Sequence, residues 1–147
     1  MTSARLSSET VHASTVATAG RAVLITGPSG SGKSDLTLRL LDRGFTLVSD
    51  DQTIVRRDGD RLIATAPPTI AGKLEIRGIG IVDMETVKDV PVALLVELTS
   101  DIQRLPDDSR ERPILGVPLP LISIDALAAS APSKVALGLD RMGLRFK

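Results

Sequence analysis

The fold of this chain is decided by the stretch Ala22-Val23-Leu24-Ile25-Thr26-Gly27-Pro28-Ser29-Gly30-Ser31-Gly32-Lys33-Ser34. Its first five residues form a short apolar run bounded by Gly20 and Gly27, which predicts a strand that is buried on both faces. The residues that follow Lys33 favour a helix with three leucines on one face. The glycine-rich segment therefore connects a predicted strand to a predicted helix.

This segment, Gly27-Pro28-Ser29-Gly30-Ser31-Gly32-Lys33-Ser34, fits the phosphate-loop pattern at every fixed position. Glycines permit a tight turn whose backbone N–H groups point at phosphate oxygens, and the start of a helix adds its positive dipole end. Lys33 is long enough to reach the β and γ phosphates, and Ser34 offers a hydroxyl to Mg²⁺. The alternative is a Gly/Ser loop that matches the pattern by chance. Because the segment also lies between a predicted strand and a predicted helix, which the motif requires, we predict nucleotide binding. No motif distinguishes adenine from guanine.

Downstream of the helix, Gly44 is the expected helix stop, and residues 45–48 predict a second strand. The order strand, loop, helix, strand predicts a right-handed crossover between parallel strands. Asp50 and Asp51 follow the second strand, at the edge of the sheet that also holds the loop. One of the two carboxylates could act on Mg²⁺ or its waters, and one could accept a hydroxyl proton. The alternative is a polar strand exit that caps the next turn.

The remaining chain predicts mostly β-structure. Residues 53–57 and 61–66 flank Asp58-Gly59-Asp60 as a β-hairpin, and further strands are expected at 74–77, 90–98 and 121–124. Residues 100–113 are expected to be a charged loop, and residues 133–142 a last helix that Gly138 weakens. We therefore predict an α/β fold: a phosphate-loop kinase-like core with a mixed sheet and an additional β-hairpin. Residues 1–147 are expected to form a single domain, with 1–9 frayed.

Composition excludes several functional classes. Lys plus Arg and Asp plus Glu both number 18, and aromatic residues make up 1%, which argues against nucleic-acid binding. The absence of Cys excludes disulfides, thiolate zinc sites and cysteine nucleophiles, and a single His leaves no imidazole cluster. No apolar run approaches the ~18 residues of a membrane span, and no signal-peptide core is seen. We expect a soluble, cytoplasmic protein without membrane contact.

Several charged residues have an ordinary explanation when spacing alone is considered. Glu75 and Arg77 would form a surface ion pair on an exposed strand face. The arginines of the charged loop, Arg104 among them, would be solvated, although a loop arginine could also contact transferring phosphate. His12 would be an exposed residue near a frayed end.

One longer motif changes this interpretation. Leu74-Glu75-Ile76-Arg77-Gly78-Ile79-Gly80-Ile81-Val82-Asp83 resembles the signature of the HPr kinase/phosphorylase family, whose members phosphorylate a serine of the phosphocarrier protein HPr. The phosphate loop, the separation of Asp50-Asp51 from it, and Gln103-Arg104-Leu105 also occur in family order. The resemblance extends from about residue 10 to about residue 125. It is carried mainly by the signature, because the phosphate loop occurs in many other families.

The resemblance implies roles for individual residues. Lys33 matches the phosphate-loop lysine, and Ser34 and Glu75 match the metal ligands. Asp51 matches the carboxylate that accepts the serine proton in the kinase direction and donates it in reverse. His12 and Arg104 match further active-site residues, although Gln103 and Pro106 flank Arg104 where the family has Asp-Arg-Leu-Gly. ATP, Mg²⁺ and HPr are thus the implied cofactors and partner, with a homo-oligomer, a hexamer in the family, as the implied assembly.

Three departures from the family pattern accompany this resemblance. We expect a minimal form that lacks the family's separate N-terminal domain. The glycine-rich continuation of the signature is replaced by Met84-Glu85-Thr86-Val87, and the basic Gly-Arg-Asn segment by residues 126–134. Because the family links that segment to dephosphorylation, we expect kinase activity to exceed phosphorolysis of phosphoserine-HPr.

Two other functions compete with this assignment. A small-molecule phosphate-loop kinase would use Arg104, Arg110 and Arg112 as a lid, but it gives the signature around Glu75 no role. A nucleotide-binding regulatory module would bind ATP without transferring phosphate and would not need Asp51.

Overall fold

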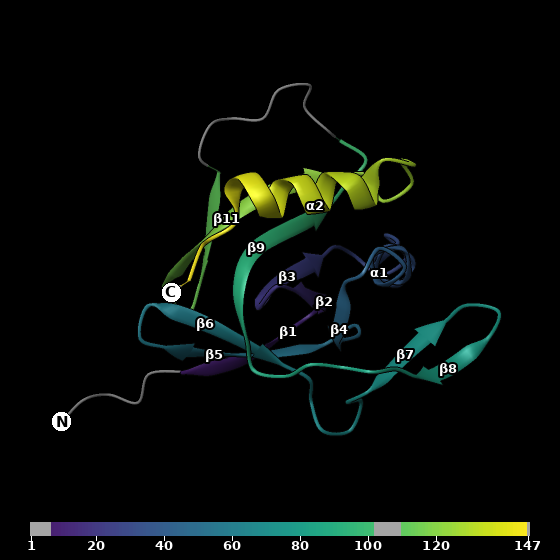
Figure 1. Cartoon of the computed structure of the whole chain (residues 1–147), viewed down its shortest axis with the longest axis horizontal. Coiled ribbons are helices and arrows are strands. Elements are labelled where there is room, and N and C mark those ends of the chain that lie inside the picture. The colour runs from purple at the N-terminus through teal and green to yellow at the C-terminus, as the bar shows by residue number, and fades with distance from the viewer. Residues whose placement is uncertain (1–6, 102–109, 147) are drawn as a thin grey trace.

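The computed structural model describes residues 7–101 and 110–146 (Figure 1). Two helices and eleven strands occur in these ranges. They follow the order β1 (Ser8–Val11), β2 (Ala13–Thr18), β3 (Arg21–Thr26), α1 (Lys33–Leu41), β4 (Thr46–Ser49), β5 (Thr53–Asp58), β6 (Arg61–Thr65), β7 (Lys73–Ile76), β8 (Gly80–Asp83), β9 (Val90–Leu98), β10 (Glu111–Ile114), β11 (Val117–Ile124) and α2 (Ala131–Met142). The predicted α/β class with a mixed sheet and an additional hairpin is confirmed.

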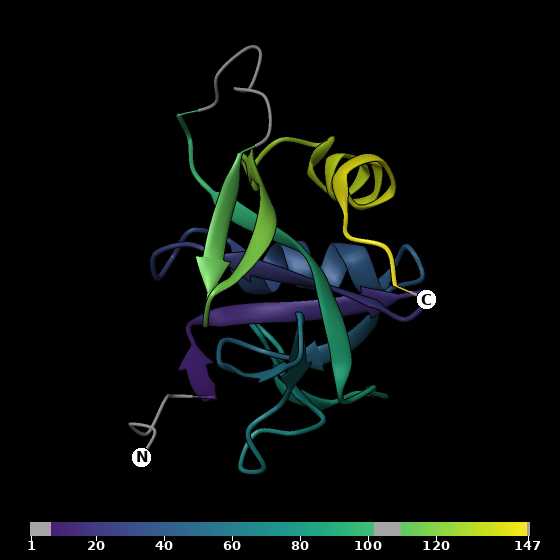
Figure 2. The same cartoon turned by 90° about the vertical axis from the view of Figure 1, so that its left-hand side faces the viewer.

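The main sheet curls around the long strand β9. Its strand order is β1-β5-β6-β9-β3-β2-β4, and β11 with its partner β10 also joins β9. Strand β9 pairs with β6 near its start, at Val90 and Pro91, and with β11 near its end, at Leu95 to Leu98. Figure 2 shows this bend, with the β10–β11 pair in green beside β9. Strands β3, β9 and β11 run parallel, so their carboxyl ends meet at one edge.

The predicted crossover from β3 through α1 to β4 differs in one respect. The two strands run parallel because both are antiparallel to β2, but β2 lies between them in the sheet. The sequence analysis did not recognise β2 as a strand. Its small and polar residues give a weak strand signal, whereas its backbone is paired on both sides and residues 13–17 are buried.

Strand β1 is a second difference. Ser8 and Glu9, which were expected to fray, pair with Arg56 and Val55 of β5. Their exposed side chains give no hydrophobic signal, so this pairing depends on backbone hydrogen bonds. The expected single domain over 1–147 stays a prediction.

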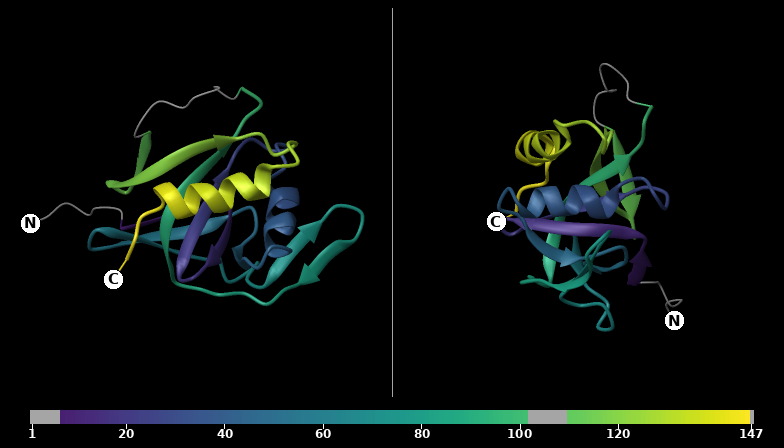
Figure 3. Two further views of the ribbon diagram at one scale, coloured as in Figure 1. Left: turned by 45° about the horizontal axis from the view of Figure 1, so that its top comes forward. Right: turned by 90° about the vertical axis from the view of Figure 1, so that its right-hand side faces the viewer.

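The core consists of two apolar clusters, one on each face of the sheet. Val23 and Ile25 of β3 pack with both helices, while Ala22 and Leu24 pack against the opposite cluster, to which β5, β6 and β11 contribute. This alternation confirms the prediction that β3 is buried on both faces. Figure 3 shows α2 crossing the molecule near α1, and Arg43 donates a hydrogen bond to Ser133 at 2.8 Å between them.

The remaining elements surround the site edge. Hairpin β7–β8 is a separate two-stranded sheet that projects beside α1 (Figure 1). The predicted hairpin at 53–66 and the strand at 90–98 are confirmed. Part of the expected charged loop is instead strand β10, and β11 begins earlier than expected. None of the helices in the described ranges has the length and apolar character that crossing a bilayer requires.

Candidate active site

The phosphate loop joins β3 to α1 and depends on two glycines. Gly32 precedes the helix with φ at 100°, a left-handed conformation that glycine adopts without strain. A Cβ atom at Gly27 would lie 2.6 Å from Ser31 Oγ and 3.1 Å from Leu98 Cβ, so any side chain there would force both neighbours to shift. The predicted loop is therefore formed between the strand and the helix that were expected to flank it.

Lys33 lies folded across the loop. Its side chain is largely buried, and its ammonium donates hydrogen bonds to the carbonyl oxygens of Gly27 at 2.7 Å and Pro28 at 3.1 Å. Ser31 Oγ is buried as well and has no hydrogen-bond partner in the described residues. A buried hydroxyl without a partner is costly, so this atom is suited to a ligand oxygen. The Lys33 ammonium and the Ser31 hydroxyl can therefore both donate hydrogen bonds to an anion bound in the loop.

Asp50 links the phosphate loop to two strands, β2 and β7. Its carboxylate accepts hydrogen bonds from Ser34 Oγ of α1 at 3.0 Å, Ser14 Oγ of β2 at 3.2 Å, and the Glu75 backbone N–H of β7 at 3.1 Å. Asp50 is only 7% exposed, so these bonds satisfy a carboxylate that water barely reaches. The geometry favours a positioning role for Asp50.

Asp51 follows Asp50 directly but makes different contacts. It has φ at 67°, and Gln52 N–H donates to the Asp50 carbonyl at 2.7 Å, which forms a tight γ-turn with a strained centre. His12 Nε2 lies 2.8 Å from Asp51 Oδ1, and both side chains are exposed. His12 is thus held against Asp51, because residues 11 and 13 belong to paired strands. The expectation that it lies near a frayed end is wrong.

The signature residues approach the loop from hairpin β7–β8. Glu75 and Arg77 are exposed, and no ion pair joins them among the residues that the structure describes. Both instead line a cavity of about 540 Å³ together with Lys33, Ser34 and Asp51. Glu75 and Arg77 therefore do not form the surface ion pair that their spacing favours. Glu75 instead lies in one cavity with Lys33, Ser34 and Asp51, the other residues to which the family resemblance assigns roles there.

This smaller cavity has donors suited to Mg²⁺. Ser34 and Glu75 present a hydroxyl and a carboxylate, and oxygen is the ligand that Mg²⁺ prefers. Within the described ranges no three His, Cys, Asp or Glu residues group as a metal site. Mg²⁺ in phosphoryl-transfer sites usually takes one or two carboxylates plus substrate phosphates, so this sparse donor set fits it.

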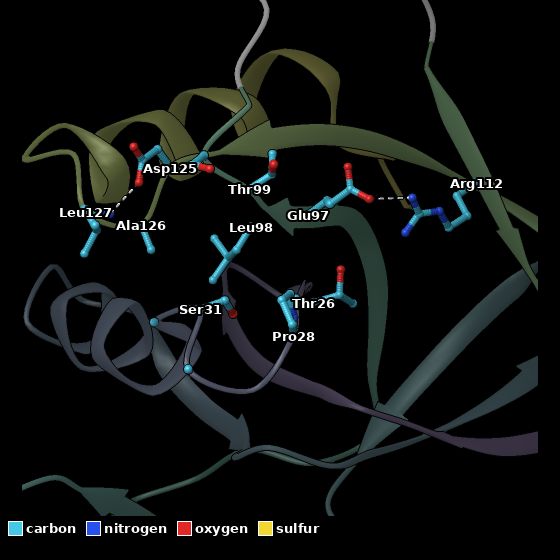
Figure 4. A pocket seen from close by; sticks show the side chains of 14 residues that line it. Thr26, Pro28, Ser31, Glu97, Leu98, Thr99, Arg112, Asp125, Ala126 and Leu127 are labelled. Carbon is cyan, nitrogen blue, oxygen red and sulfur yellow. Dashed lines mark hydrogen bonds and ion pairs between the residues drawn. The ribbon is translucent and has the colours of Figure 1, made fainter.

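A larger cavity of about 770 Å³ also borders the loop (Figure 4). Glu97 at the end of β9 bonds Arg112 at 2.8 Å and lies 3.7 Å from Arg110, which also donates to Ser123. The hydrogen bond from Arg112 lowers the pKa of Glu97. The described loop arginines are thus paired with β9, contrary to the expectation of solvated side chains.

One implied residue, Arg104, lies outside the described residues, as do Gln103 and Leu105. Two residues that the sequence analysis missed are Ser14, which bonds Asp50, and Glu97. Ser14 lies in a strand that was not recognised, and Glu97 is a single charge at the end of an apolar run, so neither carries a sequence signal of its own.

Comparison with known proteins identifies relatives over most of the chain. Residues 4–136 match the model of the HPr serine kinase C-terminal domain. HPr kinase/phosphorylase of Chlorobium limicola is 40% identical over 92% of this chain, and that of Ralstonia nicotianae 35% over 81%. The chain covers 44% and 40% of these two relatives, so it spans less than half of their length.

A solved structure agrees with this result. The HPr(Ser) kinase/phosphatase from Coxiella burnetii superposes with a TM-score of 0.77 at 30% identity, covering 90% of this chain and 94% of that one. The chain belongs to the family of HPr serine kinase C-terminal domains.

Proposed function

We propose that this chain is an ATP-dependent kinase that phosphorylates a serine of HPr. One observation carries the proposal: Asp51, with His12 bonded to it, lines the same cavity as Lys33 of the phosphate loop. A protein kinase needs a carboxylate near the γ-phosphate, where the substrate hydroxyl arrives. The names of the relatives supply the identity of that hydroxyl.

The residues divide the chemistry among them. On binding ATP, Lys33 exchanges its bonds with the two loop carbonyls for β and γ phosphate oxygens. Ser34 and Glu75 would hold Mg²⁺, which supplies positive charge against the phosphates when bound. The serine oxygen of HPr attacks the γ-phosphorus, the bond to the β-phosphate oxygen breaks, and the serine proton passes to Asp51. His12 holds the Asp51 carboxylate toward the cavity.

Asp50 acts differently from Asp51 in this proposal. Its carboxylate accepts three hydrogen bonds from the protein and is nearly buried. It positions the hydroxyl of Ser34 and the backbone at Glu75, the two groups assigned to Mg²⁺. The sequence suggested that one aspartate acts on the metal and the other on the proton. We assign the first role to Asp50 and the second to Asp51.

The decisive experiment mixes the chain with HPr, Mg²⁺ and ATP labelled at the γ position. We expect label on an HPr serine. Lys33→Ala should abolish transfer and weaken ATP binding, and the exposed Lys88→Ala should change neither. ATP binding without labelled HPr would favour a regulatory module, and transfer only to small molecules would favour the other kinase class.

Two further aspects stay predictions. Reverse phosphorolysis of phosphoserine-HPr would use Asp51 as the proton donor, and the relatives' names include phosphorylase and phosphatase. The homo-oligomeric assembly, a hexamer by resemblance to the family, is likewise an expectation from the sequence, to be tested by light scattering. The cytoplasmic location is also an expectation, to be tested by cell fractionation.

A further inference from the structure

The two cavities beside the phosphate loop differ in what lines them. The smaller one contains the groups assigned above to phosphoryl transfer. The larger one contains none of them, yet the two share Gly30, Gly32, Ala126 and Leu127 as a common wall. A nucleotide whose phosphates lie on the loop can therefore have its γ-phosphate in the smaller cavity and continue into the larger one.

The larger cavity has the position and size of a nucleoside site. It lies at the carboxyl ends of β3, β9 and β11, where open α/β sheets bind their ligands. Its volume of about 770 Å³ falls within the range of small-molecule pockets. Leu98 and Leu127 supply apolar surface, and Glu97, Thr99 and Asp125 supply polar groups (Figure 4).

The charges in the larger cavity favour an uncharged ligand portion. Glu97 and Asp125 are carboxylates, and Arg112, the cation that lines the cavity with them, is already bonded to Glu97. A second phosphate would therefore find no unpaired cation among the described residues that line this cavity. Hydroxyl and amine groups, by contrast, donate hydrogen bonds to carboxylates.

Leu127 is unusual because it is exposed and yet held in place. It is 91% exposed at the rim of both cavities. Asp125 Oδ1 accepts a hydrogen bond from the Leu127 N–H at 2.9 Å, and Arg39 of α1 donates to the carbonyls of Ala126 and Ala128 on either side. A Cβ atom at Gly32 would lie 3.0 Å from Ala126 Cβ, so the same segment packs directly on the phosphate loop. An apolar side chain is thereby held beside the loop and is left uncovered by the residues that the structure describes.

We propose that the larger cavity binds the ribose and base of ATP, with the base resting on Leu127 and the ribose hydroxyls donating to Glu97. This inference rests on the proposed function, because it needs the phosphates of ATP in the loop. Leu127 covers one face of the base and loses its exposure on binding. Glu97 lines the cavity and is held by hydrogen bonds from both Arg112 and Ser123, so its orientation does not have to be established when the ribose arrives.

The test separates the nucleoside from the phosphates by using two ligands. Binding of Mg²⁺-ATP and of Mg²⁺-tripolyphosphate, which lacks the nucleoside, is measured by calorimetry on Leu127→Ser and on the control Leu137→Ser, a leucine of α2 that is 54% exposed away from both cavities. Leu127→Ser should weaken ATP binding about tenfold, as expected for losing part of a buried leucine contact. It should leave tripolyphosphate binding within about twofold, and Leu137→Ser should change neither.

A second comparison tests the ribose contact. The wild-type chain should bind ATP more tightly than 2′,3′-dideoxy-ATP, and Glu97→Ala should bring this ratio close to one. Arg112→Ala keeps the Glu97 carboxylate, so this variant should retain most of the preference for ATP over 2′,3′-dideoxy-ATP. Equal losses of ATP and tripolyphosphate, or unchanged ATP binding in both Leu127→Ser and Glu97→Ala, would overturn the inference. Failure of the wild-type chain to bind either ligand would instead overturn the proposed function itself.

Discussion

Removal of the Asp50 carboxylate should loosen the site and destabilise the whole chain. Asp50→Ala removes the acceptor of three hydrogen bonds, from Ser14, Ser34 and Glu75. At about 1 kcal/mol per bond, the free energy of unfolding should fall by about 3 kcal/mol. Ser14 is fully buried, so water cannot easily replace its lost acceptor. For a chain of this length, the change corresponds to a Tm lower by about 6–12 °C.

Urea unfolding and amide hydrogen exchange measure the two parts of this effect. The amide of Glu75 should exchange faster in Asp50→Ala under native conditions, because the bond that holds β7 to Asp50 is gone. Asp50→Asn should cost less, about 1 kcal/mol, since the hydroxyls of Ser14 and Ser34 can rotate to accept from its amide. Asp140→Ala, at an exposed position of α2, is the matched control and should change stability by less than about 0.5 kcal/mol. Wild-type stability and wild-type exchange at Glu75 in Asp50→Ala would refute the positioning role.

Three further predictions concern the reaction and the pH dependence. Asp51→Asn should keep ATP binding but lower transfer to HPr by about 10²–10⁴-fold, the usual contribution of a positioned base; the base phenotype in Asp50→Asn instead would reverse our assignment. Arg112 lowers the pKa of Glu97 below its ordinary 4.5. The Glu97–Arg112 pair therefore stabilises the fold at pH values above 4.5, and this contribution is lost as the pH falls through the lowered pKa of Glu97. When the free energy of unfolding is measured by urea at a series of pH values, the value for Glu97→Gln should decrease less steeply than that of wild type on the acid side. Finally, kinase turnover should exceed phosphate-dependent release of pyrophosphate from phosphoserine-HPr, because the basic segment is replaced by residues 126–134; phosphorolysis at or above the kinase rate in millimolar phosphate would show that segment to be unnecessary.

The sequence by itself determined the local elements whose chemistry is written in adjacent residues. The apolar run of β3, the glycines of the loop and the leucine face of α1 are consecutive, so the strand–loop–helix unit follows from local patterns. The signature around Glu75 is equally local, and it led to the family that the comparisons then established. The hairpin of β5 and β6 was predictable because its turn contains Gly59 between two alternating strands.

Only the tertiary structure decided how distant segments meet. Strand β2 carries few large apolar residues, and its position between β3 and β4 is set by backbone pairing on both sides, which leaves no sequence signal. That insertion places Ser14 against Asp50 and His12 against Asp51. The first two residues are separated by 36 positions in the sequence and the second two by 39. The different contacts of the two aspartates accompany the left-handed backbone at Asp51. The position of Leu127, between β11 and α2, depends on hydrogen bonds from Arg39 of α1 to the carbonyls beside it. Local patterns specify which groups are present, whereas their relative positions arise from long-range pairing and packing, whose energies depend on the whole fold.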